Sequence, residues 1–140
     1  MRLEYYALSK DLFNDLIEVK NKVQQCGLDK KLIELMYLRI SQINGCQYCI
    51  KVHSADLTKQ GESQQRIDAV NNWQDSSLFT NQEKTAFAWA ESLTNIKETQ
   101  ADDHYYQPLK AYFSDKEISD LTFAVALMNA FNRLAIALGH

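Results

Sequence analysis

The chain has 140 residues, of which 46% are hydrophobic and 24% charged, with only four glycines and one proline. This composition is typical of a soluble globular protein and argues against disorder, so we predict a single domain over residues 1–140. The formal net charge is −3, and the basic residues are scattered among acidic ones, which argues against a nucleic-acid partner. Residues 1–13 contain charged side chains and no apolar run typical of a signal peptide, so we expect a cytoplasmic protein.

Hydrophobic residues recur at helical spacing along nearly the whole chain, and no segment shows the alternation of a half-buried strand. The sequence therefore predicts an all-α fold of about six helices. Their expected ranges are 9–25, 30–44, 46–61, 62–73, 81–96 and 115–138. A further short helix is expected within residues 103–113, where Pro108 favours a division into two pieces.

Several of these helices carry recognisable end signals. Gly27 follows the first helix, and Asp29 is placed to cap the second, which ends in the turn at Gly45. The stretches 80–83 and 114–117 both match a capping box, in which a hydroxyl and a carboxylate satisfy free amides reciprocally. The helices that begin there are therefore expected to start where the boxes lie.

The chemistry-bearing segment lies at the start of the third predicted helix, where Cys46 and Cys49 form a CxxC pair. A separation of three residues places both sulfurs on one helix face, where a short-loop disulfide can form. His53 follows Cys49 by four residues and therefore lies one turn further along that face. Free amides and the positive end of the helix dipole favour a thiolate at this position.

Other readings of the CxxC pair make different demands on the sequence. A zinc site needs further ligands, and the remaining Cys26, His104 and His140 show no paired spacing. Attachment of c-type haem is excluded, because Ile50 stands where the histidine would have to follow the second cysteine. A thioredoxin fold needs a βαβ pattern, and the flanking segments here are helical. Metal binding through the cysteines, His53 and an additional group stays an open alternative.

Glu34 is the other residue of interest, because it lies in a run of leucine, isoleucine and methionine side chains on the second predicted helix. A carboxylate that faces inward is costly unless it has a partner. Cys26, next to Gly27, is interpreted as a structural residue.

Glu34, eleven intervening residues and then CxxCxxxH resemble the active-site signature of the AhpD-like alkylhydroperoxidases, within the carboxymuconolactone decarboxylase superfamily. Residues 43–46, 57–61, 83–91 and 127–135 are also similar to members of this family. Well-studied members have a histidine before the second cysteine, whereas this chain has Tyr48. The decarboxylases of the superfamily lack the CxxC pair, which argues against lactone decarboxylation.

The resemblance implies an AhpD-like helical fold and a thiol-dependent peroxidase. Cys49 would attack a hydroperoxide and Cys46 would form the disulfide, with His53 as base and Glu34 orienting it. Helix position alone favours Cys46 as the more reactive thiol, whereas the spacing to His53 favours Cys49. No bound cofactor or metal is implied. An external dithiol, such as a lipoyl-bearing or thioredoxin-like protein, would be the reductant. The rival functions are those of a metal-binding or sensory protein, or of a related lyase.

The last predicted helix is apolar on nearly every side from residue 121 to 138. Arg133 inside it argues against a membrane span, because a central arginine costs about 2.5 to 3.5 kcal/mol on insertion. A helix of this kind must be buried all round, which predicts a homo-oligomer. Family members form trimers or hexamers, in agreement. Arg133, Asn129 and Asn132 are then expected to pair at or near a subunit contact.

Overall fold

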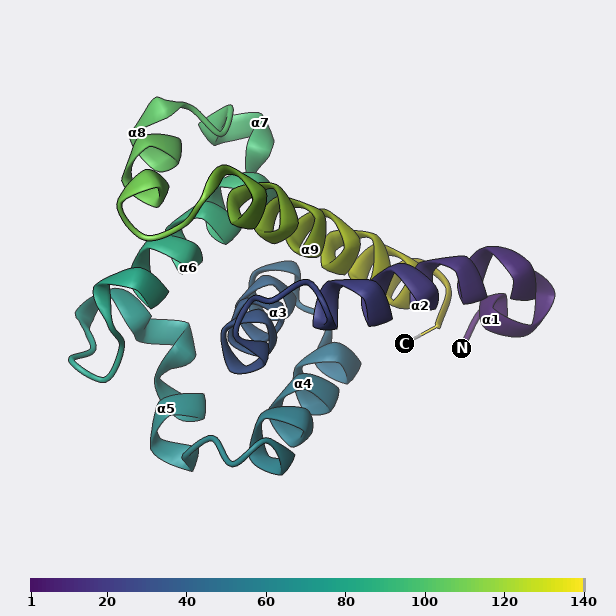
Figure 1. Ribbon diagram of the computed structural model, residues 1–140. Coiled ribbons are helices and arrows are strands. Elements are labelled where there is room, and N and C mark those ends of the chain that lie inside the picture. Colours follow the sequence, from purple (N-terminus) through teal and green to yellow (C-terminus); the bar gives the residue numbers. More distant parts are fainter. Residues whose placement is uncertain (140) are drawn as a thin grey trace.

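The computed structural model describes residues 1–139, and all of its regular elements are helices (Figure 1). The α-helices are α1 (Tyr5–Leu8), α2 (Lys10–Gln24), α3 (Lys30–Asn44), α4 (Gln47–Lys59), α5 (Gln64–Ala69), α6 (Asn81–Thr94), α7 (Ile96–Thr99), α8 (Asp103–Tyr106) and α9 (Asp115–Leu134). The 3₁₀ segments η1 (Val70–Asp75) and η2 (Gln107–Ala111) follow α5 and α8, and the π-helical segment η3 (Ala135–Gly139) ends α9. The all-α prediction is confirmed.

The predicted number of about six helices is too low for the described residues. The additional elements α1, α7 and α8 have four residues each, and a single turn is too short to show a hydrophobic period. The segment around Pro108 is divided into α8 and η2, as its proline indicates. The fourth predicted helix begins at Gln64, after its cap Ser63, and changes to 3₁₀ geometry at Val70.

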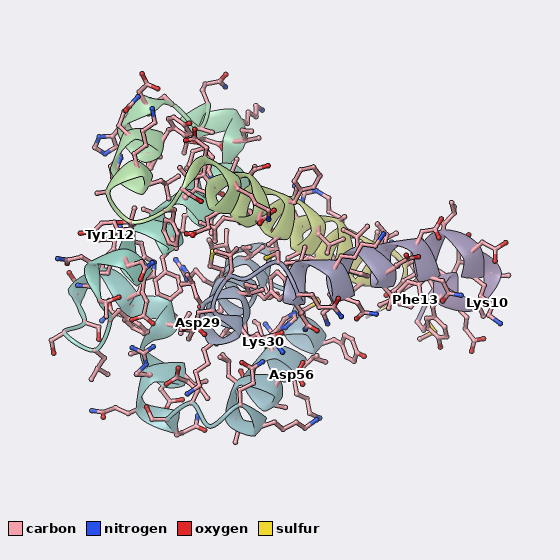
Figure 2. The ribbon with its side chains drawn as sticks, in the orientation of Figure 1. Lys10, Phe13, Asp29, Lys30, Asp56 and Tyr112 are labelled. Atoms are coloured by element: carbon pink, nitrogen blue, oxygen red, sulfur yellow. A yellow bond between two sulfur atoms is a disulfide. The ribbon has the colours of Figure 1, made fainter. Side chains whose placement is uncertain are left out.

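The end signals mostly form as predicted. The Asp29 carboxylate accepts a hydrogen bond from the Lys31 amide at the start of α3 (Figure 2). Thr80 and Glu83 form both bonds of a capping box. At α9, the Ser114 hydroxyl accepts a bond from the Glu117 amide. These local bonds place the beginnings of α3, α6 and α9.

Helix α3 lies at the centre of the molecule, with α2, α4, α6 and α9 around it (Figure 1). Every side chain of residues 32–38 is buried. One side of α3 packs against α6 and α9, and its other side packs with Leu57 of α4, Ile67 of α5 and Phe87 of α6. Because burial of a large aliphatic or aromatic side chain contributes about 1.5 to 3 kcal/mol, these two clusters dominate the stability of the fold.

Helix α9 is the most apolar element, and the stretch Asp115–Gly139 is long and apolar enough by length and composition alone to cross a membrane. It packs against α2, α3 and α6, which accounts for much of its composition. It is not covered completely, because Phe123 is 65% exposed and Ile136 of the following η3 is 45% exposed.

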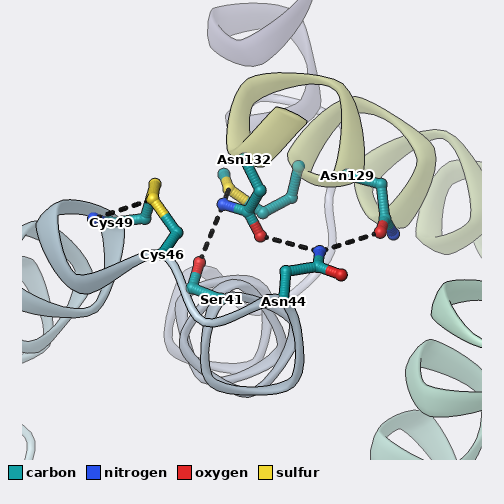
Figure 3. Close-up of a disulfide and its surroundings, with 7 residues drawn as sticks. Ser41, Asn44, Cys46, Cys49, Asn129 and Asn132 are labelled. Atoms are coloured by element: carbon teal, nitrogen blue, oxygen red, sulfur yellow. Dashed lines mark hydrogen bonds between the residues drawn. A yellow bond between two sulfur atoms is a disulfide. The ribbon is translucent and has the colours of Figure 1, made fainter. Parts of the chain in front are cut away.

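The polar residues of α9 have hydrogen-bond partners within the chain, whereas their expected place at or near a subunit contact stays a prediction. Asn44 at the end of α3 donates hydrogen bonds to the side-chain oxygens of Asn129 and Asn132, and each bond is 3.0 Å long (Figure 3). Asn132 donates a 3.1 Å hydrogen bond to the Ser41 hydroxyl, and Arg133 donates to Asn129. These bonds attach the turn after α3 to the end of α9.

Asn132→Ala is expected to lower the free energy of unfolding by about 2 to 4 kcal/mol, because Asn132 is fully buried and its loss removes the bond to the Ser41 hydroxyl and one of the two bonds that the Asn44 amide donates. The melting temperature should fall by roughly 6 to 12 °C in a calorimetric scan. Asn21→Ala, at an exposed position of α2, is the matched control and should melt like the wild type. Equal melting temperatures for all three proteins would mean that the asparagine network does not stabilise the fold.

Candidate active site

The α3–α4 turn places the two cysteines. Gly45 ends α3 with a φ of 72°, a left-handed conformation that glycine adopts without steric cost. Cys46 is the N-cap of α4 and Cys49 lies in its first turn, so the predicted position of the pair at a helix N-terminus is confirmed. This helix is the third of the predicted helices and is labelled α4 because the short α1, which the sequence pattern did not show, precedes them.

Cys46 and Cys49 form a disulfide with a Cα–Cα distance of 5.2 Å (Figure 3). The Cys49 amide also donates a 3.3 Å hydrogen bond to the Cys46 sulfur. Both cysteines are buried, at 2% and 6% exposure, and pack with Ala135 of η3. Cys26 is free, partly buried and packed against the main core cluster, as its structural interpretation requires.

Glu34 and His53 meet across the α3–α4 interface. The His53 Nδ1 atom lies 2.9 Å from the Glu34 Oε2 atom, and both side chains are almost completely buried. When Glu34 is ionised its oxygens only accept hydrogen bonds, so Nδ1 carries the proton and Nε2 of a neutral imidazole keeps the lone pair. The inward carboxylate therefore has the partner that the sequence required.

Tyr37, one turn beyond Glu34 on α3, packs its ring against His53 with 5.3 Å between the ring centroids. Its hydroxyl is buried and has no hydrogen-bond partner among the described residues. Burial raises the pKa of Tyr37 well above its usual value, and the nearby Glu34 carboxylate raises it further. Tyr37 is therefore a neutral phenol beside the Glu34–His53 pair.

Asp56, one turn beyond His53 on α4 (Figure 2), adds a second carboxylate to the pair. The ligand-type atoms of Glu34, His53 and Asp56 all lie within 4.8 Å of one another. Asp56 is partly exposed and lies 3.9 Å from the Lys59 ammonium. Among the described residues, Glu34, His53 and Asp56 have the ligand atoms and the spacing that could hold a metal ion.

A cavity of about 210 Å³ opens next to the disulfide. Its walls come from α1, α2, α4 and the end of α9. The lining side chains are Tyr5, Tyr6, Phe13, Ile17, Lys20, Tyr48, Cys49, Val52, His53, Met128, Phe131 and Ala135. Cys49 and His53 thus face one shared space, and Cys46 is not among its lining residues. A small molecule in this cavity would meet Cys49 rather than Cys46.

The structure brings together all four site residues that the sequence predicts, namely Glu34, Cys46, Cys49 and His53. His104 lies on the exposed surface of α8, and His140 lies outside the described residues. Sequence reasoning missed most of the cavity wall and Asp56. The spacing of Asp56 from His53 was visible in the sequence, but nothing local linked residues 5–20 to the cysteines.

A helical fold with a CxxC pair at a helix N-terminus and a buried Glu–His pair beside it defines an AhpD-like protein. The sequence profile described as the carboxymuconolactone decarboxylase family matches residues 10–92. The chain belongs to this family.

Individual relatives agree with this assignment. A solved structure from Agrobacterium tumefaciens, of a protein of unknown function described as an AhpD-type antioxidant defence protein, superposes with a TM-score of 0.94. It is 36% identical over 98% of this chain and 94% of that one. The uncharacterised protein YdfG of Bacillus subtilis is 28% identical over 99% of this chain and 95% of its own length. The alkyl hydroperoxide reductase AhpD of Corynebacterium kroppenstedtii is 38% identical, but over only 44% of this chain and 38% of that protein.

Proposed function

We propose that the protein is a thiol-dependent peroxidase that reduces hydroperoxides through Cys46 and Cys49. The observation that carries this proposal is the shared cavity, in which Cys49 and His53 face the same space while Glu34 holds His53 from behind. A nucleophile, a base and a residue that orients the base are the parts that activated-thiol chemistry needs.

The reaction proceeds in three balanced steps. The Cys49 thiolate attacks the outer oxygen of the hydroperoxide and breaks the O–O bond, giving a sulfenic acid and an alkoxide that takes a proton from the His53 imidazolium. The Cys46 thiol then displaces water from the sulfenic acid and forms the disulfide. An external dithiol reduces this disulfide by exchange and is itself oxidised. A lipoyl-bearing or thioredoxin-like protein in the cytoplasm is the donor that we propose, with no bound cofactor.

Counting thiols after one addition of peroxide tests this proposal. Reduced protein has three cysteines, and an equimolar organic hydroperoxide is expected to leave one thiol, that of Cys26, with an intrachain Cys46–Cys49 bridge in the peptide map. Cys26→Ser should go from two thiols to none, as its matched control. Three remaining thiols in the wild type, or a bridge through Cys26, would contradict the proposal.

Metal binding is the second candidate function, and the group formed by Glu34, His53 and Asp56 favours it. Carboxylate and imidazole ligands suit Zn²⁺, with water completing the coordination. Calorimetric titration of reduced protein with Zn²⁺ separates the two functions, with Asp56→Asn as the variant that removes one ligand. Tight stoichiometric binding that is lost in Asp56→Asn, together with no consumption of peroxide, would favour a metal-binding or sensory protein.

We also propose that the protein is a homo-oligomer, a trimer or hexamer by the family resemblance. The start of α2 extends away from the bundle with α1 (Figure 1), and both Leu8 and Leu12 there are 71% exposed. Phe123 of α9 is a further exposed large apolar side chain. Light scattering after size exclusion should give at least twice the 16.1 kDa chain mass at micromolar concentration. A monomer mass would contradict the proposal.

A further inference from the structure

The cavity beside Cys49 has an aromatic wall opposite the catalytic helix. Tyr5 of α1 and Phe13 of α2 are in edge contact, with 5.9 Å between ring centroids, and Phe13 contacts Phe131 of α9 at 6.1 Å. A volume of about 210 Å³ is several times the share of about 30 Å³ that one water molecule takes in the liquid. The site therefore has room for an organic group beside the hydroperoxide.

Among the described residues that line this cavity, Lys20 is the lysine, and none is an aspartate or a glutamate. The side chain is partly buried, and no carboxylate within the described residues forms an ion pair with it. Seven other lysines also form no ion pair within the described residues, but five of them, Lys10, Lys30, Lys51, Lys97 and Lys110, are exposed, whereas Lys20 is partly buried in the cavity wall. A partly desolvated ammonium without an anion is unfavourable, so a bound anion would stabilise it.

We propose that Lys20 binds a carboxylate of the substrate, and that the preferred substrates are organic hydroperoxides that carry such a group. The hydroperoxide end would lie at Cys49 and His53, the apolar part on the aromatic wall, and the carboxylate at the Lys20 ammonium. A charge-assisted hydrogen bond in a partly water-excluded site is stronger than its counterpart at the surface. This inference rests on the proposed peroxidase function.

The test compares 4-(2-hydroperoxypropan-2-yl)benzoate with its methyl ester, which has the same reactive group and no charge. Reduced protein is mixed with each compound without a reductant, and the second-order rate constant of thiol loss is measured. The wild type should react about tenfold faster with the acid than with the ester. Lys20→Gln should bring the ratio near one, and Lys20→Glu should bring it below one.

Lys22→Gln is the matched control, because Lys22 lies on the same helix but is exposed and paired with Glu18. It should keep the wild-type ratio. Circular dichroism and melting curves verify that each variant is folded. Equal wild-type rates for acid and ester, or a preference for the acid that survives in Lys20→Gln, would overturn the inference while leaving the peroxidase function intact.

A second measurement separates the two proposals if neither compound oxidises the wild type, which would end the peroxidase proposal. Calorimetry with the corresponding alcohols, 4-(2-hydroxypropan-2-yl)benzoate and its methyl ester, reports on the cavity without any chemistry. Tighter binding of the acid, lost in Lys20→Gln, would support the carboxylate site by itself. Equal binding of both alcohols would refute it.

Discussion

Cys49→Ser is expected to lower the rate of peroxide reduction by at least about 10³-fold, because the serine hydroxyl stays protonated and cannot replace the attacking thiolate. Cys46→Ser should also stop turnover, but for another reason, since it removes the thiol that forms the disulfide. In Cys46→Ser a sulfenic acid should still form at Cys49 and be captured by a dimedone-type reagent. Mass spectrometry of the labelled peptide measures it.

The geometry makes this comparison informative, because the two sulfurs have different advantages. Cys46 caps α4, where the helix dipole and the Cys49 amide stabilise negative charge on its sulfur. Cys49 instead lines the cavity together with His53. If Cys46 in Cys49→Ser is labelled as fast as Cys49 in Cys46→Ser, the roles assigned to the two cysteines must be exchanged. A lyase of the kind that gives the family its name would keep its activity when both cysteines are serine.

Glu34→Gln and His53→Gln are each expected to slow thiol oxidation by about 10²- to 10⁴-fold, the usual cost of removing a positioned acid or base. Glutamine in place of Glu34 can still accept the hydrogen bond from Nδ1 of His53, so this variant removes the charge and keeps the contact. His53→Gln removes the base itself. Stopped-flow measurement of thiol loss with a single organic hydroperoxide gives both rate constants.

The matched controls are Glu98→Gln on α7 and His104→Gln on α8, because both residues are exposed and lie outside the cavity. They should react like the wild type. If Glu34→Gln also reacts like the wild type while its melting temperature falls, Glu34 serves to join α3 to α4 and takes no part in the chemistry.

Much of the local structure was predictable from the sequence, because it depends on neighbours a few residues apart. Asp29 and Thr80 cap their helices through side chains that reach amides two or three residues ahead. The alignment of Cys46, Cys49 and His53 follows from helical spacing alone. Helices of one turn, such as α1 and α7, were not predictable, because four residues show no period.

Contacts between distant segments were a different matter. The sequence showed that Glu34 needed a buried partner and that Arg133, Asn129 and Asn132 could not stay unpaired. Residue spacing did not show where the partners were: only the family resemblance implied His53 for Glu34, and the asparagines have theirs within the chain, at Asn44 and Ser41. Buried polar groups are almost always hydrogen-bonded, so the need for a partner is predictable, but the residue that supplies it is not.

The sequence by itself determined that the chain is helical, where its long helices begin, and which cysteines and histidine share one helix face. The tertiary structure placed Glu34 against His53, as the family resemblance implied, and it alone decided that Cys49, rather than Cys46, faces a cavity. It also decided that Lys20 and the aromatic side chains of α1, α2 and α9 form the wall opposite Cys49. The physical reason is that hydrogen bonds and periodicity within a helix are local, whereas the packing of α2 on α9, and of α4 and α9 on α3, depends on apolar surfaces far apart in the sequence.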